Sequence, residues 1–252
     1  MVTRDDVGAE VRPAHPARRV VSLVPSLTEA VAAADRSALV GATQWCTHPA
    51  DLDVPRVRGT KNPDLASIVD LAPDLVIANK EENRELDVRR LRDKRIPVWV
   101  TVTETVRGAI GSMRRLFTDG LGWAVPEWLE QVDDAWPDRV PTPTHRIAIP
   151  IWRDPWMVVG RATFTGDLAA RMGLANVFAD HDERYPHVSV ADIVAREPDV
   201  VVLPDEPYEF SPIDGPEAFP DLSCALVEGR AMTWYGPSLL TARETVLSAF
   251  RG

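Results

Sequence analysis

Hydrophobic residues recur every three or four positions between residues 103 and 121, which is the spacing of one face of an α-helix. The apolar positions on this face are Val106, Ile110, Met113, Leu116, Phe117 and Leu121. Thr101 and Glu104 stand three residues apart in front of them, as in a capping box. We predict a long helix here, between two halves of the chain that each alternate short strands with helices.

The first half contains short apolar runs rich in β-branched residues, each followed by a turn and an amphipathic segment. Strands are predicted at 20–24, 39–43, 75–78 and 98–102. Ser26 and Glu29 form the capping pattern S-x-x-E of a first helix, and Asn62 is the predicted cap of a second. A charged third helix is predicted near 85–94, and residues 1–18 form a polar, partly ordered arm.

The second half follows the same plan after a predicted helix at 123–140 and the linker Pro141-Thr142-Pro143. Strands are predicted at 147–151, 176–178, 200–203 and 230–234, with a hairpin at 152–159. Thr165, Ser189 and Ser238 are the predicted caps of three helices.

One short motif occurs in both halves with the same spacing. Ile68-Val69 precede Pro73-Asp74 in the first half, and Ile193-Val194 precede Pro198-Asp199 in the second. A strand and an acidic loop follow each Pro-Asp pair, and two copies in matching places favour paired α/β lobes. We predict an N-terminal lobe at 19–102, a connecting helical region at 103–140 and a C-terminal lobe at 145–252.

Aromatic residues gather in the loops that follow the predicted strands. They are Trp45, Trp152, Trp156, Tyr185, Tyr208, Phe210, Trp234 and Tyr235. An isolated aromatic residue more often packs in a core or a hairpin, but this set occupies strand ends in both halves. Ligands of parallel sheets bind beyond the carboxyl ends of the strands, and facing lobes would place these loops around one cleft. The set therefore favours a large, flat, partly apolar ligand.

Composition and charge narrow the choice of partners. The net charge is −10 and the sequence pI is about 5.0, which argues against nucleic acid or an anionic membrane. No apolar run approaches the ~20 residues that span a bilayer. The first nineteen residues contain no apolar leader core and no lipid-attachment cysteine, so we expect a cytoplasmic protein.

Candidate residues for metal binding and catalysis are few. Cys46 and His48 are close in sequence, as are His181 and His187, but neither pair matches a closed zinc pattern, so we predict no metal site. Nucleophile-elbow, phosphate-loop and dinucleotide motifs are absent. Helix capping explains Ser26 more simply than a nucleophile does, and we predict no catalytic residues. Cys46 and Cys224 are expected to be free thiols, with one disulfide as the alternative.

Four segments are distinctive when taken together: VVSLVPSLTEAV, VGATQWCTHP, IVDLAPDLVIAN and IVAREPDVVVLP. With them, the chain from about Arg19 to Phe250 resembles the class III substrate-binding proteins, the helical-backbone receptors for cobalamin, haem and iron–siderophore complexes. The similarity is closest to the cobalamin-binding branch. The resemblance implies two Rossmann-like α/β lobes joined by a single long backbone helix, a ligand cleft between the lobes, a monomer and no catalysis.

The resemblance also implies a set of ligand-binding residues. Carried over position by position, they are Ser26, Trp45, Lys61, Asn79, Lys80, Trp152, Tyr185, Tyr208 and Trp234. Trp156 joins them from the aromatic set. The implied ligand is a corrinoid, haem or iron–siderophore type of metal chelate, and no further cofactor is expected.

Transporter-coupled members of this family present one glutamate on each lobe to the ABC permease. Ala66 and Ala191 occupy those positions here, with Asp64 and Asp192 nearby. Together with the missing leader, this favours a cytoplasmic receptor or carrier that works without a transporter. The alternatives are an ABC-importer binding protein whose start is mis-assigned, a hydrolase or cofactor-processing enzyme, and a protein-interaction module.

Overall fold

The computed structural model describes residues 2–251, except for the side chain of Arg251, and it divides into two units. The first unit contains the chain up to Thr103, residues 108–134 and residues 235–237. The second contains residues 104–107, residues 135–234 and the chain from Ser238 onward. Within the described residues, no helix has the length and apolar character needed to cross a membrane. The lobe boundaries predicted from the sequence stay a prediction.

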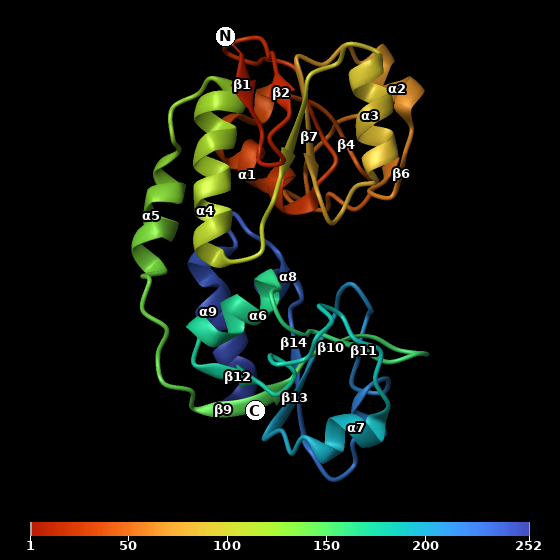
Figure 1. Cartoon of the computed structure of the whole chain (residues 1–252), viewed down its shortest axis with the longest axis vertical. Coiled ribbons are helices and arrows are strands. Elements are labelled where there is room, and N and C mark those ends of the chain that lie inside the picture. Colours follow the sequence, from red (N-terminus) through yellow and green to blue (C-terminus); the bar gives the residue numbers. More distant parts are fainter. Residues whose placement is uncertain (1, 252) are drawn as a thin grey trace. The chain divides into compact units, whose positions relative to one another are not determined.

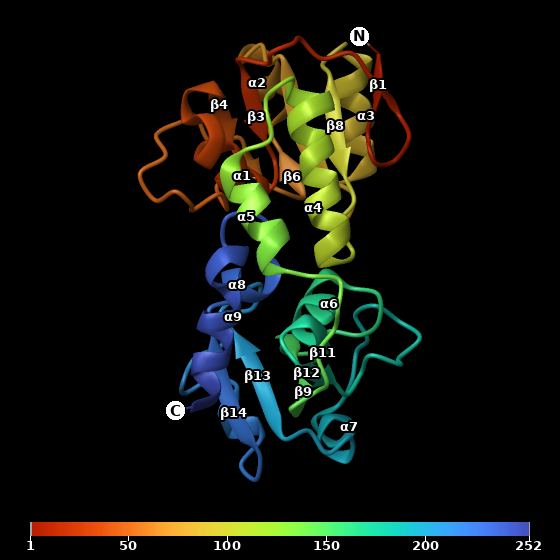
Figure 2. The same ribbon diagram turned by 90° about the vertical axis from the view of Figure 1, so that its left-hand side faces the viewer.

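The first unit is built on a parallel sheet of four strands in the order β4-β3-β7-β8. The strands are β3 (Val20–Ser22), β4 (Leu39–Ala42), β7 (Leu75–Asn79) and β8 (Val98–Thr101). Figures 1 and 2 show α2 and α3 on one face of this sheet and α1 on the other. These helices are α1 (Pro25–Asp35), α2 (Leu65–Asp70) and α3 (Glu85–Asp93). Shorter elements are β1 (Thr3–Arg4), β2 (Glu10–Val11), β5 (Arg58–Gly59), β6 (Asn62–Pro63) and the 3₁₀ turn η1 (Arg36–Ala38).

The second unit repeats this plan with a parallel sheet in the order β12-β9-β13-β14. Its strands are β9 (His145–Ala148), β12 (Leu174–Asn176), β13 (Val200–Pro204) and β14 (Ser223–Val227), with β13 beside β14 (Figure 2). An antiparallel hairpin joins β10 (Pro150–Trp152) to β11 (Met157–Val158). The helices are α6 (Phe164–Arg171), α7 (Val190–Ala195), α8 (Arg230–Thr233) and α9 (Leu239–Ser248), with 3₁₀ turns η3 (Pro216–Ala218) and η4 (Ala249–Arg251). The strand order matches that of the first unit, so the predicted α/β class with two parallel sheets is confirmed.

The predicted long helix is confirmed as α4 (Val106–Arg115), which continues as the π-helical turn η2 (Leu116–Leu121). All six apolar positions of the predicted face are buried. The predicted capping box is wrong, because Thr101 is the last residue of β8 and the Val106 N–H donates instead to the Asp167 carboxylate at 2.8 Å. The following helix, α5 (Glu127–Ala135), is shorter than the predicted 123–140.

Each unit has its own hydrophobic core. All five residues of β7 are buried, as expected for a strand covered on both faces. The core of the first unit includes Val21, Ile68, Val76, Leu91 and Val98. The core of the second includes Ala148, Phe178, Ile193, Val201, Leu203 and Phe219. Burial of this apolar surface, at about 25 cal/mol per Å², is the main force that holds the helices against the sheets.

The aspartate of the repeated Pro-Asp motif accepts backbone N–H groups at the equivalent place in both units. The Asp74 carboxylate accepts the N–H groups of Arg18 and Arg19, at 2.8 and 2.9 Å. The Asp199 carboxylate accepts the N–H of Arg146 at 2.7 Å. Each aspartate therefore fixes the chain where the first strand of its four-stranded sheet begins. Arg19 lies just before β3, and Arg146 is part of β9.

An arginine completes this network in each unit. The Arg19 guanidinium donates to the carbonyls of Leu71 and Ala72, just beyond α2, at 2.6 and 3.2 Å. The Arg146 guanidinium donates to the carbonyls of Arg196 and Glu197, just beyond α7, at 2.7 and 3.2 Å. Carbonyl groups at a helix end have no hydrogen-bond donor within the helix, and the arginine supplies one. The two copies of the sequence motif therefore make equivalent interactions.

Several predicted boundaries are wrong because the cap residue was misassigned. Ser26 does not cap α1: Pro25 is the first helical residue and Val24 is the N-cap, without a side-chain bond. Asp64, rather than Asn62, caps α2 through the N–H groups at residues 66 and 67. Thr163, rather than Thr165, caps α6. The capping box of Ser189 is confirmed, and Ser238 is the N-cap of α9 but its side chain makes no capping bond.

Two other predicted elements are also corrected. The predicted strand at 230–234 is helix α8, and the fourth strand of the second sheet is β14, which the sequence analysis missed. The predicted strand at 147–151 divides into β9 and β10 around Ile149. The N-terminal arm is part of the first unit, because the buried Asp5 carboxylate pairs with Arg92 at 2.7 Å and accepts the Val100 N–H at 3.2 Å.

Candidate functional site

Most of the residues predicted to bind a ligand lie in loops that follow the parallel strands, whereas Trp152 ends the antiparallel strand β10 and Trp234 follows α8. Ser26, Trp45, Lys61, Asn79 and Lys80 lie in the first unit, and Trp152, Trp156, Tyr185, Tyr208 and Trp234 in the second. The carboxyl edge is where open parallel sheets present their loops and bind ligands.

Three of the predicted residues in the first unit are exposed. The side chain of Trp45, in the loop after β4, is 58% exposed, and its indole lies close to Gly59. A Cβ atom at Gly59 would lie 3.1 Å from the indole nitrogen of Trp45. The indole can pack here because Gly59 has no side chain. Lys61 donates from its ammonium group to the carbonyl of Glu81, and Lys80 is exposed on the same loop after β7.

Asn79 is buried and holds the loop that follows β7. Its side-chain amide donates to the hydroxyls of Thr101 and Thr103, at 3.2 and 3.1 Å. Its carbonyl oxygen accepts the Glu81 N–H at 2.8 Å, and its own N–H donates to Asn83 at 2.8 Å. These bonds satisfy both ends of the amide, so Asn79 orders the loop.

Ser26 is also buried, at the first turn of α1. Its hydroxyl and that of Thr103 lie beside the phenol of Tyr235. This phenol donates to the Glu82 carboxylate at 3.0 Å. Burial first, and then the charge of Glu82, raise the pKa of Tyr235 well above its ordinary value.

In the second unit, a chain of ring contacts joins three of the predicted residues. Trp152 meets Tyr208 edge to face, with ring centroids 5.7 Å apart. The ring centroids of Tyr208 and Phe210 are 4.7 Å apart, and Phe210 stacks on Trp156 with 5.8 Å between their ring centroids. Phe219, which the sequence analysis did not single out, closes the cluster against Trp156 at 5.3 Å. We call these five residues the aromatic platform.

Arg153 holds this platform to the loop before η3. Its guanidinium lies 5.4 Å from the centre of the Trp156 ring and forms ion pairs with Asp214 and Glu217. Asp214 in turn accepts the Tyr208 hydroxyl at 2.7 Å, and this bond raises the pKa of Tyr208. The sequence analysis missed Asp214 and Glu217, because nothing in their local pattern links them to a hairpin about 60 residues earlier.

Tyr185 and Trp234 are placed by other contacts. Tyr185 is 37% exposed and lies beside the guanidinium of Arg184, at 5.8 Å from the ring centre. Trp234 is buried, with the guanidinium of Arg230 at 5.7 Å. The role of all ten residues in ligand binding stays a prediction.

The residues considered for metal binding have local partners. Among the described residues, no group of three or more histidine, cysteine, aspartate or glutamate side chains is arranged to hold a metal ion. The His181 imidazole accepts the Glu183 N–H at 3.0 Å, and His48 lies 3.1 Å from the Thr47 hydroxyl. Cys46 is fully buried, with the hydroxyls of Thr28 and Thr43 at 3.0 and 3.1 Å.

The two cysteines are expected to differ sharply in reactivity. Burial raises the pKa of the Cys46 thiol, and the pKa of the half-buried Cys224 thiol is raised for the same reason. Because attack requires an exposed thiolate, Cys46 should react with a thiol-specific disulfide reagent at least about 100-fold more slowly than Cys224. Cys224→Ser should remove the faster phase and Cys46→Ser the slower one. Equal rates in the native protein would contradict this burial.

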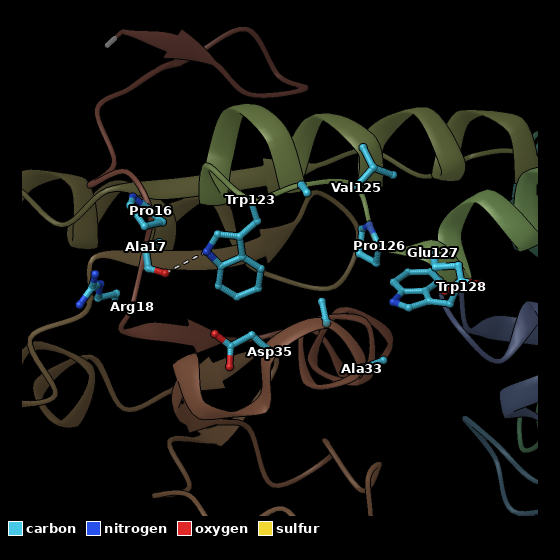
Figure 3. Close-up of a pocket in the computed structure, with 12 residues that line it drawn as sticks. Pro16, Ala17, Arg18, Ala33, Asp35, Trp123, Val125, Pro126, Glu127 and Trp128 are labelled. Atoms are coloured by element: carbon cyan, nitrogen blue, oxygen red, sulfur yellow. Dashed lines mark hydrogen bonds between the residues drawn. The ribbon is translucent and has the colours of Figure 1, made fainter.

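A hollow of about 570 Å³ lies elsewhere in the first unit (Figure 3). It is lined by the end of α1, by residues 16–18 and by residues 123–128. Trp123 lies along it and donates from its indole to the carbonyl of Ala17 at 3.0 Å. Residues 16–18 come just before β3, and α1 ends beside them, so the hollow is at the amino edge of the sheet. None of the ten candidate residues lines it, and we therefore place the candidate site at the carboxyl edges.

Curated proteins with detectable sequence similarity are named as vitamin B12-binding proteins, although no family model matches the chain. The protein of Pectobacterium carotovorum subsp. carotovorum (strain PC1) is 24% identical over 248 residues, which cover 92% of this chain and 87% of that protein. The protein of Vibrio cholerae serotype O1 (strain ATCC 39541) is 24% identical over 193 residues, which cover 74% of this chain and 70% of that protein.

Solved structures share the fold over nearly the whole chain. The periplasmic vitamin B12 binding protein BtuF of Vibrio cholerae has a TM-score of 0.76 and 21% identity, covering 94% of this chain and 98% of that one. The periplasmic heme-binding protein RhuT from Roseiflexus sp. RS-1 has a TM-score of 0.75 and 20% identity, covering 92% and 97%. CeuE of Helicobacter pylori has a TM-score of 0.79 and 14% identity, covering 100% and 90%. The fold class predicted from the sequence is confirmed.

The prediction of a cytoplasmic protein is wrong. Similar solved structures, including BtuF, RhuT and HutB of Vibrio cholerae, are described as periplasmic proteins, and this finding overturns the prediction. The prediction relied on the first nineteen residues, and the start of a given sequence does not determine where a protein resides. The idea of a carrier without a transporter loses its support for the same reason.

Proposed function

We propose that this chain, which belongs to the class III, helical-backbone family of substrate-binding proteins, binds a bulky metal chelate of the corrinoid or haem type and does not transform it. Its relatives are named for vitamin B12 or heme, and both ligands are large, flat macrocycles. The aromatic platform of the second unit is the observation that carries the proposal.

The platform suits a flat, partly apolar ligand for two reasons. Trp152 keeps 44% of its surface exposed while it contacts Tyr208 in an edge-to-face arrangement, so part of the indole is available to a ligand ring. Arg153 and Asp214 hold Tyr208 before any ligand arrives, which lowers the entropy lost on binding. We assign Trp152 and Tyr208 as the principal contacts.

Residues at the carboxyl edge of the first unit are the second proposed set. Trp45 offers an exposed ring, and Lys61 and Lys80 are exposed cations on neighbouring loops. Ammonium groups of this kind suit the amide carbonyls or carboxylates at the periphery of a macrocycle. We assign these three residues to orientation of the ligand.

A transporter partner remains a proposal. Ala66 and Ala191 occupy equivalent exposed positions, each two residues after the N-cap of its helix, in α2 and α7. Asp64 is the N-cap of α2 and Asp192 lies in the first turn of α7, so each helix carries a carboxylate at its start. The doubt that the two alanines raised about an ABC permease therefore has no support from the fold.

The direct test is calorimetric titration of the purified protein with cyanocobalamin, haemin and a ferric siderophore. Calorimetry is preferable to fluorescence, because these ligands absorb where the eight tryptophans emit. We expect saturable binding of a corrinoid or of haem with a Kd near or below about 1 µM, or about −8 kcal/mol. Absence of binding by all three at 100-fold higher concentration, about 100 µM, would overturn the proposal.

A further inference from the structure

Three residues of the C-terminal half, Tyr235–Pro237, belong to the first unit, although the helices on both sides of them belong to the second. Tyr235 is the most deeply placed of the three tyrosines, with 4% of its surface exposed. Its phenol donates to Glu82 and lies beside the hydroxyls of Ser26 and Thr103. These three partners come from three different strand ends.

The position of this phenol in the sheet is informative. Strand order in the first unit is β4-β3-β7-β8, so the direction of winding reverses between β3 and β7. A crevice at such a reversal is the usual ligand position in open parallel sheets. Ser26 follows β3 and Glu82 follows β7, which means that Tyr235 occupies the place where this sheet would otherwise accept a ligand.

The backbone after Tyr235 approaches α1 closely. A Cβ atom on Gly236 would lie 3.2 Å from the carbonyl oxygen of Ser26 and 3.7 Å from the Cβ of Ala30. A glycine therefore allows the segment to lie directly over the first turn of α1, which covers Ser26. Ser26 and Asn79 are both buried as a result of contacts within the protein.

We propose that Tyr235 is an internal ligand of the first sheet: Glu82 binds its phenol, the hydroxyls of Ser26 and Thr103 lie beside it, and these three residues do not contact the solute. Tyr235 is then a positioning residue. By holding Glu82 it orders the loop from Asn79 to Asn83, and this loop carries Lys80. The statement that these residues do not bind the solute rests on the proposed function. The contacts of Tyr235 are independent of it.

The test is ¹⁹F NMR of protein labelled with 3-fluorotyrosine, in which each of the three resonances is assigned by a Tyr→Phe variant. Ser26→Ala and Glu82→Gln should each shift the Tyr235 resonance and leave that of Tyr185 in place. Cyanocobalamin, used as the probe, should shift the Tyr208 resonance and leave that of Tyr235 in place. If neither substitution moves Tyr235, or if the probe moves it as far as Tyr208, the inference is wrong.

The probe titration and the substitutions test the two proposals independently. If cyanocobalamin, haemin and a ferric siderophore all fail to move the Tyr208 resonance, the proposed function is in error, but the Ser26→Ala and Glu82→Gln shifts still decide whether Tyr235 is bound as described.

A hydrogen-exchange measurement tests whether Tyr235 orders the loop after β7. Tyr235→Phe should speed amide exchange between Asn79 and Asn83 about tenfold, the change expected from the loss of one bond to a carboxylate, whereas Tyr185→Phe should not. Unchanged exchange in Tyr235→Phe would contradict the positioning role.

Discussion

Trp152→Ala should weaken the binding of a corrinoid or haem probe by about 30-fold, the equivalent of about 2 kcal/mol. The indole is 44% exposed and contacts Tyr208 edge to face, with 5.7 Å between the ring centres. Alanine removes both the exposed surface and the support that it gives to Tyr208. The measurement is the Kd from calorimetric titration of the full chain.

Two matched variants make this result interpretable. Trp152→Phe keeps a smaller ring and should lose less than about tenfold in affinity. Leu240→Ala removes an equally exposed apolar side chain from α9 of the same unit and should leave the Kd unchanged. If Trp152→Ala binds as tightly as the Leu240→Ala control, the aromatic platform is not the ligand site.

Asp74→Ala and Asp199→Ala should each lower the free energy of unfolding of their own unit by about 2 kcal/mol. Each carboxylate accepts backbone N–H groups at the start of the first strand, at 2.7 to 2.9 Å. Alanine leaves those donors without this acceptor and loosens the backbone of the arginine whose guanidinium binds the end of the preceding helix. Asparagine retains a carbonyl oxygen and should cost less.

Urea denaturation followed by hydrogen exchange measures this prediction unit by unit. Asp74→Ala should increase exchange in β3 and β7, and Asp199→Ala should increase it in β9 and β13, because each network lies within one sheet. Asp221→Ala, which replaces an exposed carboxylate, provides the control. Equal loss of protection in both units from either variant would contradict the assignment of one network to each unit.

The secondary structure of the two units could be predicted from the sequence wherever the pattern involved residues close together in the chain. The apolar face of α4 follows from a spacing of three and four residues, and the buried strands β7 and β13 follow from unbroken apolar runs. The Pro-Asp motif was recognised because its two copies have the same spacing. Its partners Arg19 and Arg146 were not, because a single arginine before a strand carries no distinctive pattern.

The candidate site was only partly predictable for the same reason. Trp152, Trp156 and Tyr208 were identified by their places after predicted strands, and the structure brings them together. Ser26 and Asn79 were carried over from the family resemblance, yet both are buried within the first unit. The sequence shows which residues follow a strand, but whether a side chain is covered depends on the segment that packs over it.

The sequence by itself therefore determined the secondary-structure plan, its repetition and the strand ends that carry aromatic residues, since each depends on neighbours a few positions apart. Only the tertiary structure decided that Asp167 receives the first N–H of α4, that Arg153 pairs with Asp214, and that Tyr235 meets Glu82. The two members of each pair are 61, 61 and 153 residues apart in the chain. Packing of the sheets and helices brings such residues together, and no local spacing encodes it.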